Sequence, residues 1–439
     1  MKKIYLTYFG LTVFLIFASY KIKNEYFYLP YPNASEYLSS ILLLLLTLIL
    51  MIWKANRAKK MIAGLISITA LMITINVFNH FKQWHPLNLS LPFTKSQSFE
   101  VDYEPYNWTS VSPAKFGYNN DSINNYLEEI EKWKRLRALV VVKENHIIIE
   151  KYCSGATKYS AFNVHSVTKS ITSTLIGIAQ KKGYIKSENE LIGNYFPQHQ
   201  DIFSKEKPKS NITIANLLTM QGGFVGGDGS QNVEKVLLKE KVVRENIGNE
   251  FKYFTGSHML LSAILTNSTQ TNTKSFTEKE LFKPLQMNCG FWRNVDGYYC
   301  GGDETYYTAR DLARFGILYL NNGQVNGLQL VDSSWIKKSL TNYAKKSSSF
   351  RMLDCYEEIG YGFSWWILKF NNKTIFTARG KGGQYVLLIP DKNIIIVILQ
   401  EWNLKKNFKN ENAFLCKLLS IVDRNVEEGT NIQNSIYEK

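Results

Sequence analysis

Three stretches near the N-terminus contain no charged residue, and each is long enough to cross a lipid bilayer. They cover residues 4–20, 37–53 and 61–78, close to the lower limit of about 17 residues for a spanning helix. The first stretch alone, behind two lysines, could serve as a cleaved signal peptide. Because two more stretches follow and no clean cleavage site is present, we expect residues 1–81 to form a retained anchor of three transmembrane helices.

Basic residues decide the expected orientation of this anchor. The loop between the second and third stretches holds Lys54, Arg57, Lys59 and Lys60, whereas the first loop mixes lysines with glutamates. Since cytoplasmic loops carry an excess of Lys and Arg, we expect the basic loop inside the cell. After three spans the large domain then lies outside, so the expected protein is bound to the membrane with an extracytoplasmic domain, either periplasmic or on the cell surface.

The excess of basic residues also raises the question of nucleic acid. The formal net charge is +15 at pH 7, but the lysines are scattered rather than arranged in a stripe. No helix-turn-helix, zinc-finger or RNP pattern is present. A solvated basic surface that faces an acidic cell envelope explains the charge, so we expect no nucleic-acid partner.

The five cysteines are spaced too widely for a zinc ribbon or a CxxC redox site. They are Cys153, Cys289, Cys300, Cys355 and Cys416. Cys289 and Cys300 are close enough in sequence to form a disulfide across a local hairpin, and separate buried thiols are an equally good interpretation. One cysteine must stay unpaired within a monomer.

The chain after the anchor predicts an α+β domain. Residues 82–117 have the composition of a connector with prolines, and apolar residues at helical spacing then predict a helix with Asp121 as its N-cap. Two strand-like runs over residues 137–143 and 146–152 predict a hairpin, since only Glu144-Asn145 separates them.

A second helix is expected over residues 166–182, where Gly183 ends it, and a mostly helical lobe over about residues 187–285. The last third of the chain predicts three strands and a final amphipathic helix. Their sequences are KTIFTAR, QYVLLIP and NIIIVILQ, followed by the helix that bears Phe414, Leu415, Leu418, Leu419 and Val422. We therefore expect residues 118–430 to form an antiparallel sheet flanked by helices, with an inserted helical lobe.

A serine and a lysine lie three residues apart at the start of the second predicted helix. The hydroxyl of Ser166 would face the free N–H groups of the first turn, and the amine of Lys169 could reach it from the same face. In a partly desolvated site that lysine can take the serine's proton and create a nucleophile. The alternative is an ordinary helix cap with a solvated lysine, and the same spacing recurs at Ser112, Ser204 and Ser334.

Six segments of the chain, in order, resemble the serine β-lactamase and penicillin-binding superfamily. They are FNVHSVTKSITSTLIGIAQKKGYI (161–184), ITIANLLTMQGGF (212–224), FKYFTGSHMLLSAIL (251–265), YTARDLARFGILYLNNGQVNGLQLV (307–331), GYGFSWWI (360–367) and ARGKGGQYVLLIP (378–390). The resemblance covers about residues 115–425 and is closest to the branch of class C β-lactamases, family VIII esterases, D-aminopeptidase-like hydrolases and 6-aminohexanoate-dimer hydrolases. It implies a β-lactamase-like fold and a serine hydrolase that needs no metal or cofactor.

The resemblance also implies roles for individual residues. Ser166 would be the acylating nucleophile, Lys169 its proton acceptor, and Tyr253 in YFTG the group that relays protons. Where many relatives have Tyr-x-Asn, this chain has Thr255, so the amide-binding asparagine typical of class C β-lactamases is missing. The chain also has no Ser-Asp-Asn, so the class A arrangement is excluded.

The family's third motif falls on Lys381, Gly382 and Gly383. The next backbone N–H, that of Gln384, would join the N–H of Ser166 to bind the developing oxyanion. Lys381 stands where the esterase and amide-hydrolase branch commonly has histidine, and its ammonium could hold a substrate carboxylate. The alternative is a solvent-facing lysine at a strand edge.

No metal site is expected. Two histidines flank the motifs, His165 beside the nucleophile and His258 beyond the tyrosine, but neither has a second ligand at HExxH spacing. We interpret both as structural or cleft-lining residues.

These observations predict a membrane-anchored extracytoplasmic serine hydrolase. It would cleave amide or ester bonds of small molecules or short peptides through an acyl-enzyme on Ser166. Two alternatives stay open: a cell-wall D-alanyl peptidase or β-lactamase, and a penicillin-binding sensor that is acylated once without turnover.

Overall fold

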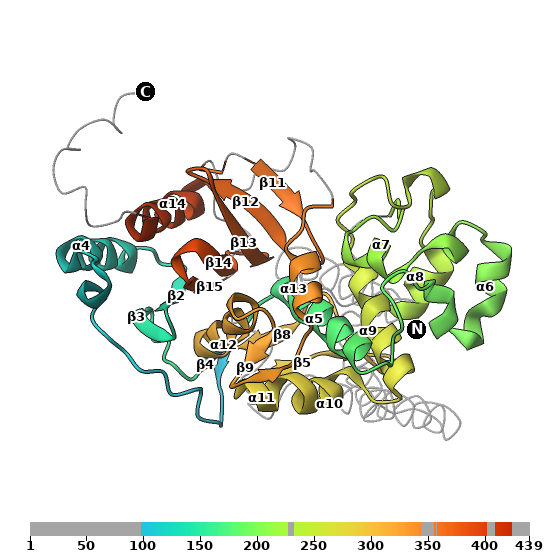
Figure 1. The fold of residues 1–439 in the computed structure, drawn as a ribbon, viewed down its shortest axis with the longest axis horizontal. Coiled ribbons are helices and arrows are strands. Elements are labelled where there is room, and N and C mark those ends of the chain that lie inside the picture. The colour runs from blue at the N-terminus through green and yellow to red at the C-terminus, as the bar shows by residue number, and fades with distance from the viewer. Residues whose placement is uncertain (1–97, 227–231, 344–354, 357, 402–408, 424–439) are drawn as a thin grey trace, which may run out of the picture. The chain divides into compact units, whose positions relative to one another are not determined.

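A seven-stranded antiparallel sheet organises the described chain (Figure 1). The computed structural model describes residues 98–226, 232–343, 355–356, 358–401 and 409–423. The strand order is β11-β12-β13-β14-β15-β2-β3, so the last strand of the sequence pairs with one of the first. The strand bounds are β2 Leu136–Lys143, β3 His146–Tyr152, β11 Glu358–Tyr361, β12 Trp366–Phe370, β13 Lys373–Gly380, β14 Gln384–Ile389 and β15 Ile394–Gln400.

Helices cover both faces of this sheet, so its central strands are buried on each side. In β15 the side chains of Ile395, Val397 and Leu399 join one core, and the alternating residues join the other, as the two-residue period of a strand requires. The helices are α5 Val167–Lys181 and α12 Ala309–Leu320 on the first face, and α4 Asn120–Glu131 and α14 Lys409–Asp423 on the second (Figure 1). The predicted antiparallel sheet between helices is confirmed.

A smaller four-stranded sheet, which the sequence did not indicate, lies in the order β1-β4-β8-β5. Its strands are β1 Ser98–Glu100, β4 Ser160–Asn163, β5 Phe291–Trp292 and β8 Thr305–Tyr307. Two short ribbons pair β6 Asn294–Val295 with β7 Tyr298–Tyr299, and β9 Gln324–Val325 with β10 Leu328–Gln329. Since β4 leads directly into α5, this small sheet fixes the start of that helix.

The described elements between β4 and β5 are all helices. After α5 they are α6 Gln200–Lys205, α7 Ile214–Leu218, α8 Val233–Lys239, α9 Gly256–Thr269, α10 Thr273–Thr277, the π-helix Glu278–Phe282 and α11 Lys283–Leu285, with short 3₁₀ turns between them. Helix α13 Ser333–Ser339 follows α12. Helix α9 packs against α5, which brings the second motif to the first.

The predicted hairpin is confirmed at β2 and β3. Glu144 and Asn145 both have positive φ, at 49° and 63°, which is the geometry of the two-residue turn that matches strand twist. The first helix differs slightly from its prediction. Its N-cap is Asn119, whose side chain accepts the N–H of Ser122 at 2.8 Å, so Asp121 lies in the first turn rather than at the cap.

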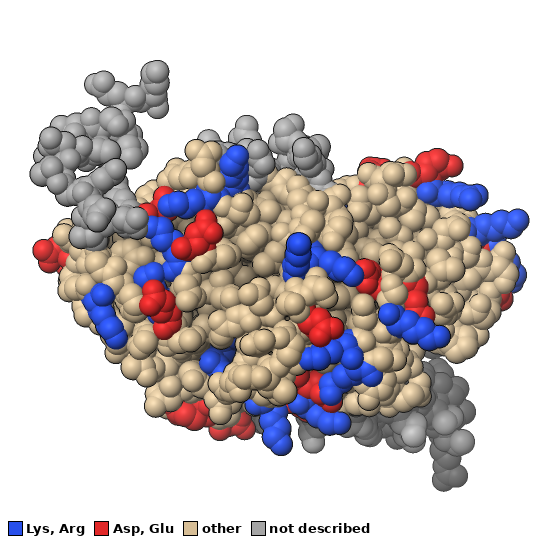
Figure 2. All heavy atoms as spheres, viewed as in Figure 1, with Lys and Arg blue, Asp and Glu red and all other residues tan. Residues whose placement is uncertain are grey.

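The predicted transmembrane anchor lies outside the described residues. Within the described ranges, no helix is long and apolar enough to cross a membrane. On the face shown in Figure 2, basic and acidic side chains are interspersed over the described surface.

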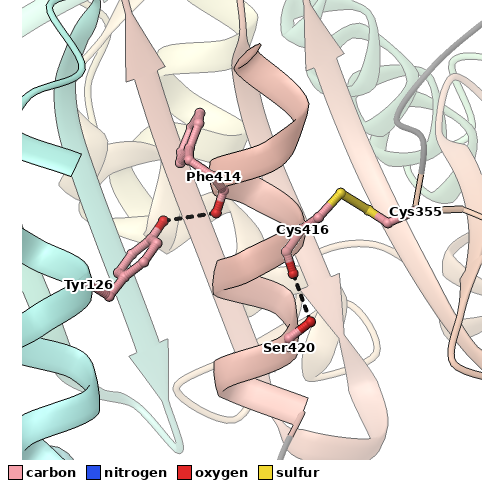
Figure 3. The surroundings of a disulfide bond; sticks show 5 residues. All are labelled: Tyr126, Cys355, Phe414, Cys416 and Ser420. Atoms are coloured by element: carbon pink, nitrogen blue, oxygen red, sulfur yellow. Dashed lines mark hydrogen bonds between the residues drawn. A yellow bond between two sulfur atoms is a disulfide. The ribbon is translucent and has the colours of Figure 1, made fainter. Parts of the chain in front are cut away.

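The cysteine pairing differs from the one that the sequence offered. Cys355, before β11, forms a disulfide with Cys416 on α14 (Figure 3). Cys153, Cys289 and Cys300 are free and buried. A hairpin of β6 and β7 does lie between Cys289 and Cys300, but no disulfide joins these two cysteines across it. The possible link between these two cysteines was therefore wrong, and their interpretation as separate buried thiols is confirmed.

This pairing predicts a specific thiol count. Denatured protein without reductant should expose three thiols, and reduction should raise the number to five. Cys416→Ser should lower the free energy of unfolding by about 2–4 kcal/mol, because it opens a long covalent loop. Thiol titration and urea denaturation measure the two effects. Five thiols before reduction, or a link to Cys289 in a peptide map, would contradict the pairing.

Candidate active site

Ser166 lies at a tight junction between β4 and α5. The preceding residue, His165, has a φ of 48°, a left-handed conformation that is uncommon for residues other than glycine. The side chain of Asn163 supports this turn by accepting the N–H of His165 at 2.9 Å. Ser166 already has right-handed helical geometry, and its hydroxyl makes no capping bond to the helix backbone. The hydroxyl is therefore not used as a helix cap.

The amine of Lys169 contacts the hydroxyl of Ser166. The distance from Nζ to Oγ is 2.8 Å, and Nζ also donates to Thr255 Oγ1 at 3.1 Å and to the carbonyl of Gly302 at 2.7 Å. Lys169 is 1% exposed. The buried amine therefore has three hydrogen-bond partners among the described residues.

The other three Ser-x-x-Lys pairs have no such surroundings. Their lysines, Lys115, Lys207 and Lys337, are all exposed. Of the four pairs, the structure brings serine and lysine into contact in a buried setting only at Ser166, which rules out a solvated lysine for Lys169.

Gly301 and Gly302, which follow α9 in the chain, lie in space between α5 and α9 and form part of the surroundings of Lys169. The carbonyl of Gly301 accepts the hydroxyl of Thr172 at 2.7 Å, next to the Gly302 carbonyl that holds Lys169. A Cβ on Gly301 would lie 2.0 Å from the carbonyl oxygen of His258, and one on Gly302 would lie 2.8 Å from Thr255. Only glycines therefore fit between the two helices. The adjacent glycines were visible in the sequence, but nothing there indicated what they touch.

Two histidines lie near this centre without forming a metal site. His165 Nδ1 is 3.1 Å from Asp303 Oδ1. Burial would raise the pKa of Asp303, but the His165 imidazole and the Lys169 charge together hold that pKa below its usual value. Burial, with the Lys169 charge, places the pKa of His258 well below its usual range, and its Nε2 lies 2.7 Å from Ser364 Oγ. In the described part of the chain, no group of three metal-ligating side chains occurs.

Tyr253 lies beside the Ser166–Lys169 pair, just before α9. The amine of Lys169 is 5.0 Å from the centre of its ring. The ring stacks on Trp366, with 5.7 Å between ring centres, and meets Tyr361 edge-on. These aromatic contacts fix the plane of the phenol. The structure therefore brings together Ser166, Lys169 and Tyr253, as the sequence predicted.

The third motif forms the turn between β13 and β14. Lys381 is exposed, and Gly382 and Gly383 have φ values of 81° and 89°. The residue before the turn, Gly380, packs against the strand that leads to the nucleophile, because a Cβ there would lie 2.0 Å from the carbonyl oxygen of Val164. The motif thus lies close to the start of α5, and Gly380 is a contact residue that the sequence did not reveal.

The backbone direction at this turn follows from the strand register. The side chain of Gln384 bonds both backbone groups of Gln400, so those groups face β14. Since Tyr385 pairs with Ile398, the alternation of an antiparallel ladder turns the N–H of Gln384 toward β13, where it faces Gly380.

The same alternation directs the N–H of Lys381 the other way. Gly380 faces β14, and in a planar trans peptide the N–H of the next residue points away from the carbonyl. The N–H of Lys381 therefore points away from β14, toward the side of β13 on which β12 lies. At this level β12 has not yet begun, since its first residue is Trp366.

Fold and site together define a protein of the β-lactamase-like class of serine hydrolases, with a buried lysine beside the helix-borne serine. Proteins of this class are enzymes, and the fold together with the Ser166–Lys169 contact is enough to assign the class. More particularly, the chain belongs to the Beta-lactamase family, whose model matches residues 134–415.

The curated relatives have low sequence identity to this chain. A Salmonella typhimurium protein named "Putative D-alanyl-D-alanine carboxypeptidase" is 22% identical over 224 residues, which are 43% of this chain and 51% of that protein. The chain thus spans about half the length of the curated relatives that it matches.

Solved structures share the fold over more of the chain. The "Putative 6-aminohexanoate-dimer hydrolase from Bacillus anthracis" has a TM-score of 0.59 at 18% identity and covers 79% of this chain and 94% of its own. The octameric penicillin-binding protein homologue from Pyrococcus abyssi has a TM-score of 0.53 at 17% identity, with 70% and 78% covered. At these identities the likeness establishes the fold alone.

The contact of Thr255 with Lys169 generates a prediction. Thr255→Val keeps the shape of the side chain but removes one acceptor, which leaves a buried N–H bond without its partner. We expect the free energy of unfolding to fall by about 1–3 kcal/mol and the rate of Ser166 acylation to fall with it. Thr255→Ser retains the hydroxyl, so this variant should keep both close to their wild-type values. The same substitution at buried Thr277, which bonds only a helix carbonyl, should leave the acylation rate unchanged. Equal acylation rates for Thr255→Val and wild type would show that this contact does not matter.

Proposed function

We propose that the protein hydrolyses amide or ester bonds of small molecules or short peptides through an acyl-enzyme on Ser166. The observation that supports this most directly is the 2.8 Å contact between Lys169 Nζ and Ser166 Oγ, with the lysine 1% exposed. For this step Lys169 must be the neutral amine, whose lone pair takes the proton of Ser166 as Oγ attacks the substrate carbonyl. Tyr253, beside the amine, passes protons to the leaving group and from the deacylating water.

The oxyanion of the tetrahedral intermediate needs donors that are already in position. The first is the N–H of Ser166 itself. For the second, the sequence favoured Gln384, but the strand register supports the N–H of Lys381 instead, because that of Gln384 faces β13. We therefore propose Ser166 and Lys381 as the two backbone donors.

The side chain of Lys381 supports a preference for substrates with a carboxylate. It lies on the turn next to Gly380, which packs against Val164 two residues before the nucleophile. An exposed ammonium at this place can pair with an acidic group on the substrate.

A cell-wall D-alanyl peptidase is the second candidate. Two observations favour it: the Salmonella relatives carry that name, and D-alanyl termini bear the carboxylate that Lys381 would hold. In both cases the bond cleaved is an acyl bond, and the same residues carry the reaction.

We also propose that residues 1–81 anchor the protein in a membrane and that the hydrolase domain lies outside the cytoplasm. The support is the hydropathy of the three uncharged stretches and the basic loop between the last two. The Cys355–Cys416 disulfide agrees with this location, since disulfides persist in oxidising compartments.

A serine-directed probe tests the nucleophile. A fluorophosphonate should label Ser166 alone, because among the serines of the four Ser-x-x-Lys pairs, all of them in the described chain, only Ser166 contacts a buried lysine. Ser112, Ser204 and Ser334 serve as controls within the same chain, and peptide mass spectrometry locates the label. A label on one of these three, with Ser166 unmodified, would disprove the assignment.

The carboxylate preference is tested by Lys381→Ala, which removes the ammonium and retains the backbone N–H. KM should rise about tenfold or more for a carboxylate-bearing amide and change little for a neutral ester, because only the first uses the charge. Steady-state kinetics on both substrates measure the difference. Equal effects on the two would refute this role.

Membrane topology is tested with reporter fusions. A reporter joined after residue 57 should read as cytoplasmic, and one after residue 90 as exported, because the basic loop should stay inside. An exported reporter after the first position, or a cytoplasmic one after the second, would contradict the proposed orientation.

A further inference from the structure

Two buried side chains donate hydrogen bonds to consecutive carbonyls of the β13–β14 turn. Arg135 Nη2 donates to Gly382 O at 3.1 Å, and Gln400 Nε2 donates to Gly383 O at 3.2 Å. Arg135 is 7% exposed and Gln400 is 2% exposed. Arg135 and Gln400 together form what we name the turn clamp.

The turn depends on support of this kind because its glycines cannot fix it. Both have positive φ, and glycine moves between backbone conformations more freely than any other residue. At Gly383 a Cβ would lie 2.3 Å from Gln400 Nε2, so the absence of a side chain makes room for the donor. The side chain of Gln400 thus occupies space that any side chain at position 383 would need.

The clamp itself is held by neighbouring strands. Arg135 immediately precedes β2, and its Nε donates to the carbonyl of Glu401 at 3.0 Å. Gln400 ends β15, and its Oε1 accepts the indole N–H of Trp133 at 3.0 Å. The side chain of Gln384 bonds the backbone of Gln400 at 2.7 and 3.1 Å. The turn is thereby tied to β15 and β2, two neighbouring strands that each pair on both sides within the sheet.

We propose that Arg135 and Gln400 are positioning residues for the oxyanion site. By holding the carbonyls of Gly382 and Gly383 from behind, they fix the turn so that the N–H of Lys381 stays directed at a substrate oxygen on Ser166. This inference rests on the proposed function. A buried guanidinium is costly to desolvate. Here it donates to the Gly382 carbonyl in the turn and to the Glu401 carbonyl just after β15. Oxyanion donors act only if they are held in place before the reaction, and displacement by about 1 Å can cost a factor of about 100 in rate.

The test uses Arg135→Met and Gln400→Met, which remove the donors and keep most of the volume. Both should lower kcat for a neutral ester roughly 10- to 100-fold with little change in KM. Affinity for phenylboronic acid should fall by a similar factor, because its tetrahedral serine adduct places an oxygen between the same donors. If Arg135 and Gln400 only stabilised the fold, folded variants would not lose kcat and boronate affinity by a similar factor.

Arg314→Met is the matched control. Arg314 is also buried, at 5% exposed, and donates to a backbone carbonyl, that of Leu285, at 2.7 Å. This variant should lose stability but keep kcat and boronate affinity. Folded clamp variants with wild-type kcat and boronate affinity would overturn the inference, as would equal losses in Arg314→Met. If wild type itself neither hydrolyses esters nor binds the boronate, the proposed function fails and the clamp's role fails with it.

Discussion

The buried amine of Lys169 is the interaction on which the rest of the site depends. A lysine that is 1% exposed must be hydrogen-bonded on every side, and its three partners come from three separate parts of the chain: Ser166, Thr255 and Gly302. These contacts draw the starts of α5 and α9 together around the glycine segment. The hydrogen bonds that this buried amine requires therefore also assemble the nucleophile next to the residues that follow Tyr253.

The seven-stranded sheet provides the second fixed boundary of the site. Helix α5 packs on β13 and β14, and Gly380 allows β13 to approach Val164 closely. The β13–β14 turn is held from the opposite side by Arg135 and Gln400. Nucleophile and turn are thus held by different elements, the small sheet and the large one, and their separation is set by glycine contacts that no larger residue would permit.

Much of the fold could be predicted from sequence because the strands and helices are strongly periodic. The runs that became β2, β3, β13, β14 and β15 are apolar and bounded by turn residues, and α14 buries the apolar residues expected of it. The small sheet could not be predicted, since its strands are two to four residues long and owe their pairing to tertiary contacts.

Within the site, Ser166, Lys169 and Tyr253 were predictable because motifs of fixed spacing carry them. The disulfide, the Thr255 contact and the turn clamp were not, because they join residues far apart in the chain. Cys355 and Cys416 are 61 residues apart, and Arg135 lies 247 residues from Gly382. The oxyanion donor shows the difference most clearly: the motif pointed to Gln384, and only the register of three strands directs attention to Lys381.

The rate at which Ser166 is acylated in Lys169→Met tests the central claim most directly. The variant should be compared with wild type by stopped-flow acylation with an activated ester, after circular dichroism has shown that it folds. The account predicts that the acylation rate falls by about 10²–10⁴-fold, because the serine loses its proton acceptor. An acylation rate equal to that of wild type would show that Lys169 does not activate Ser166.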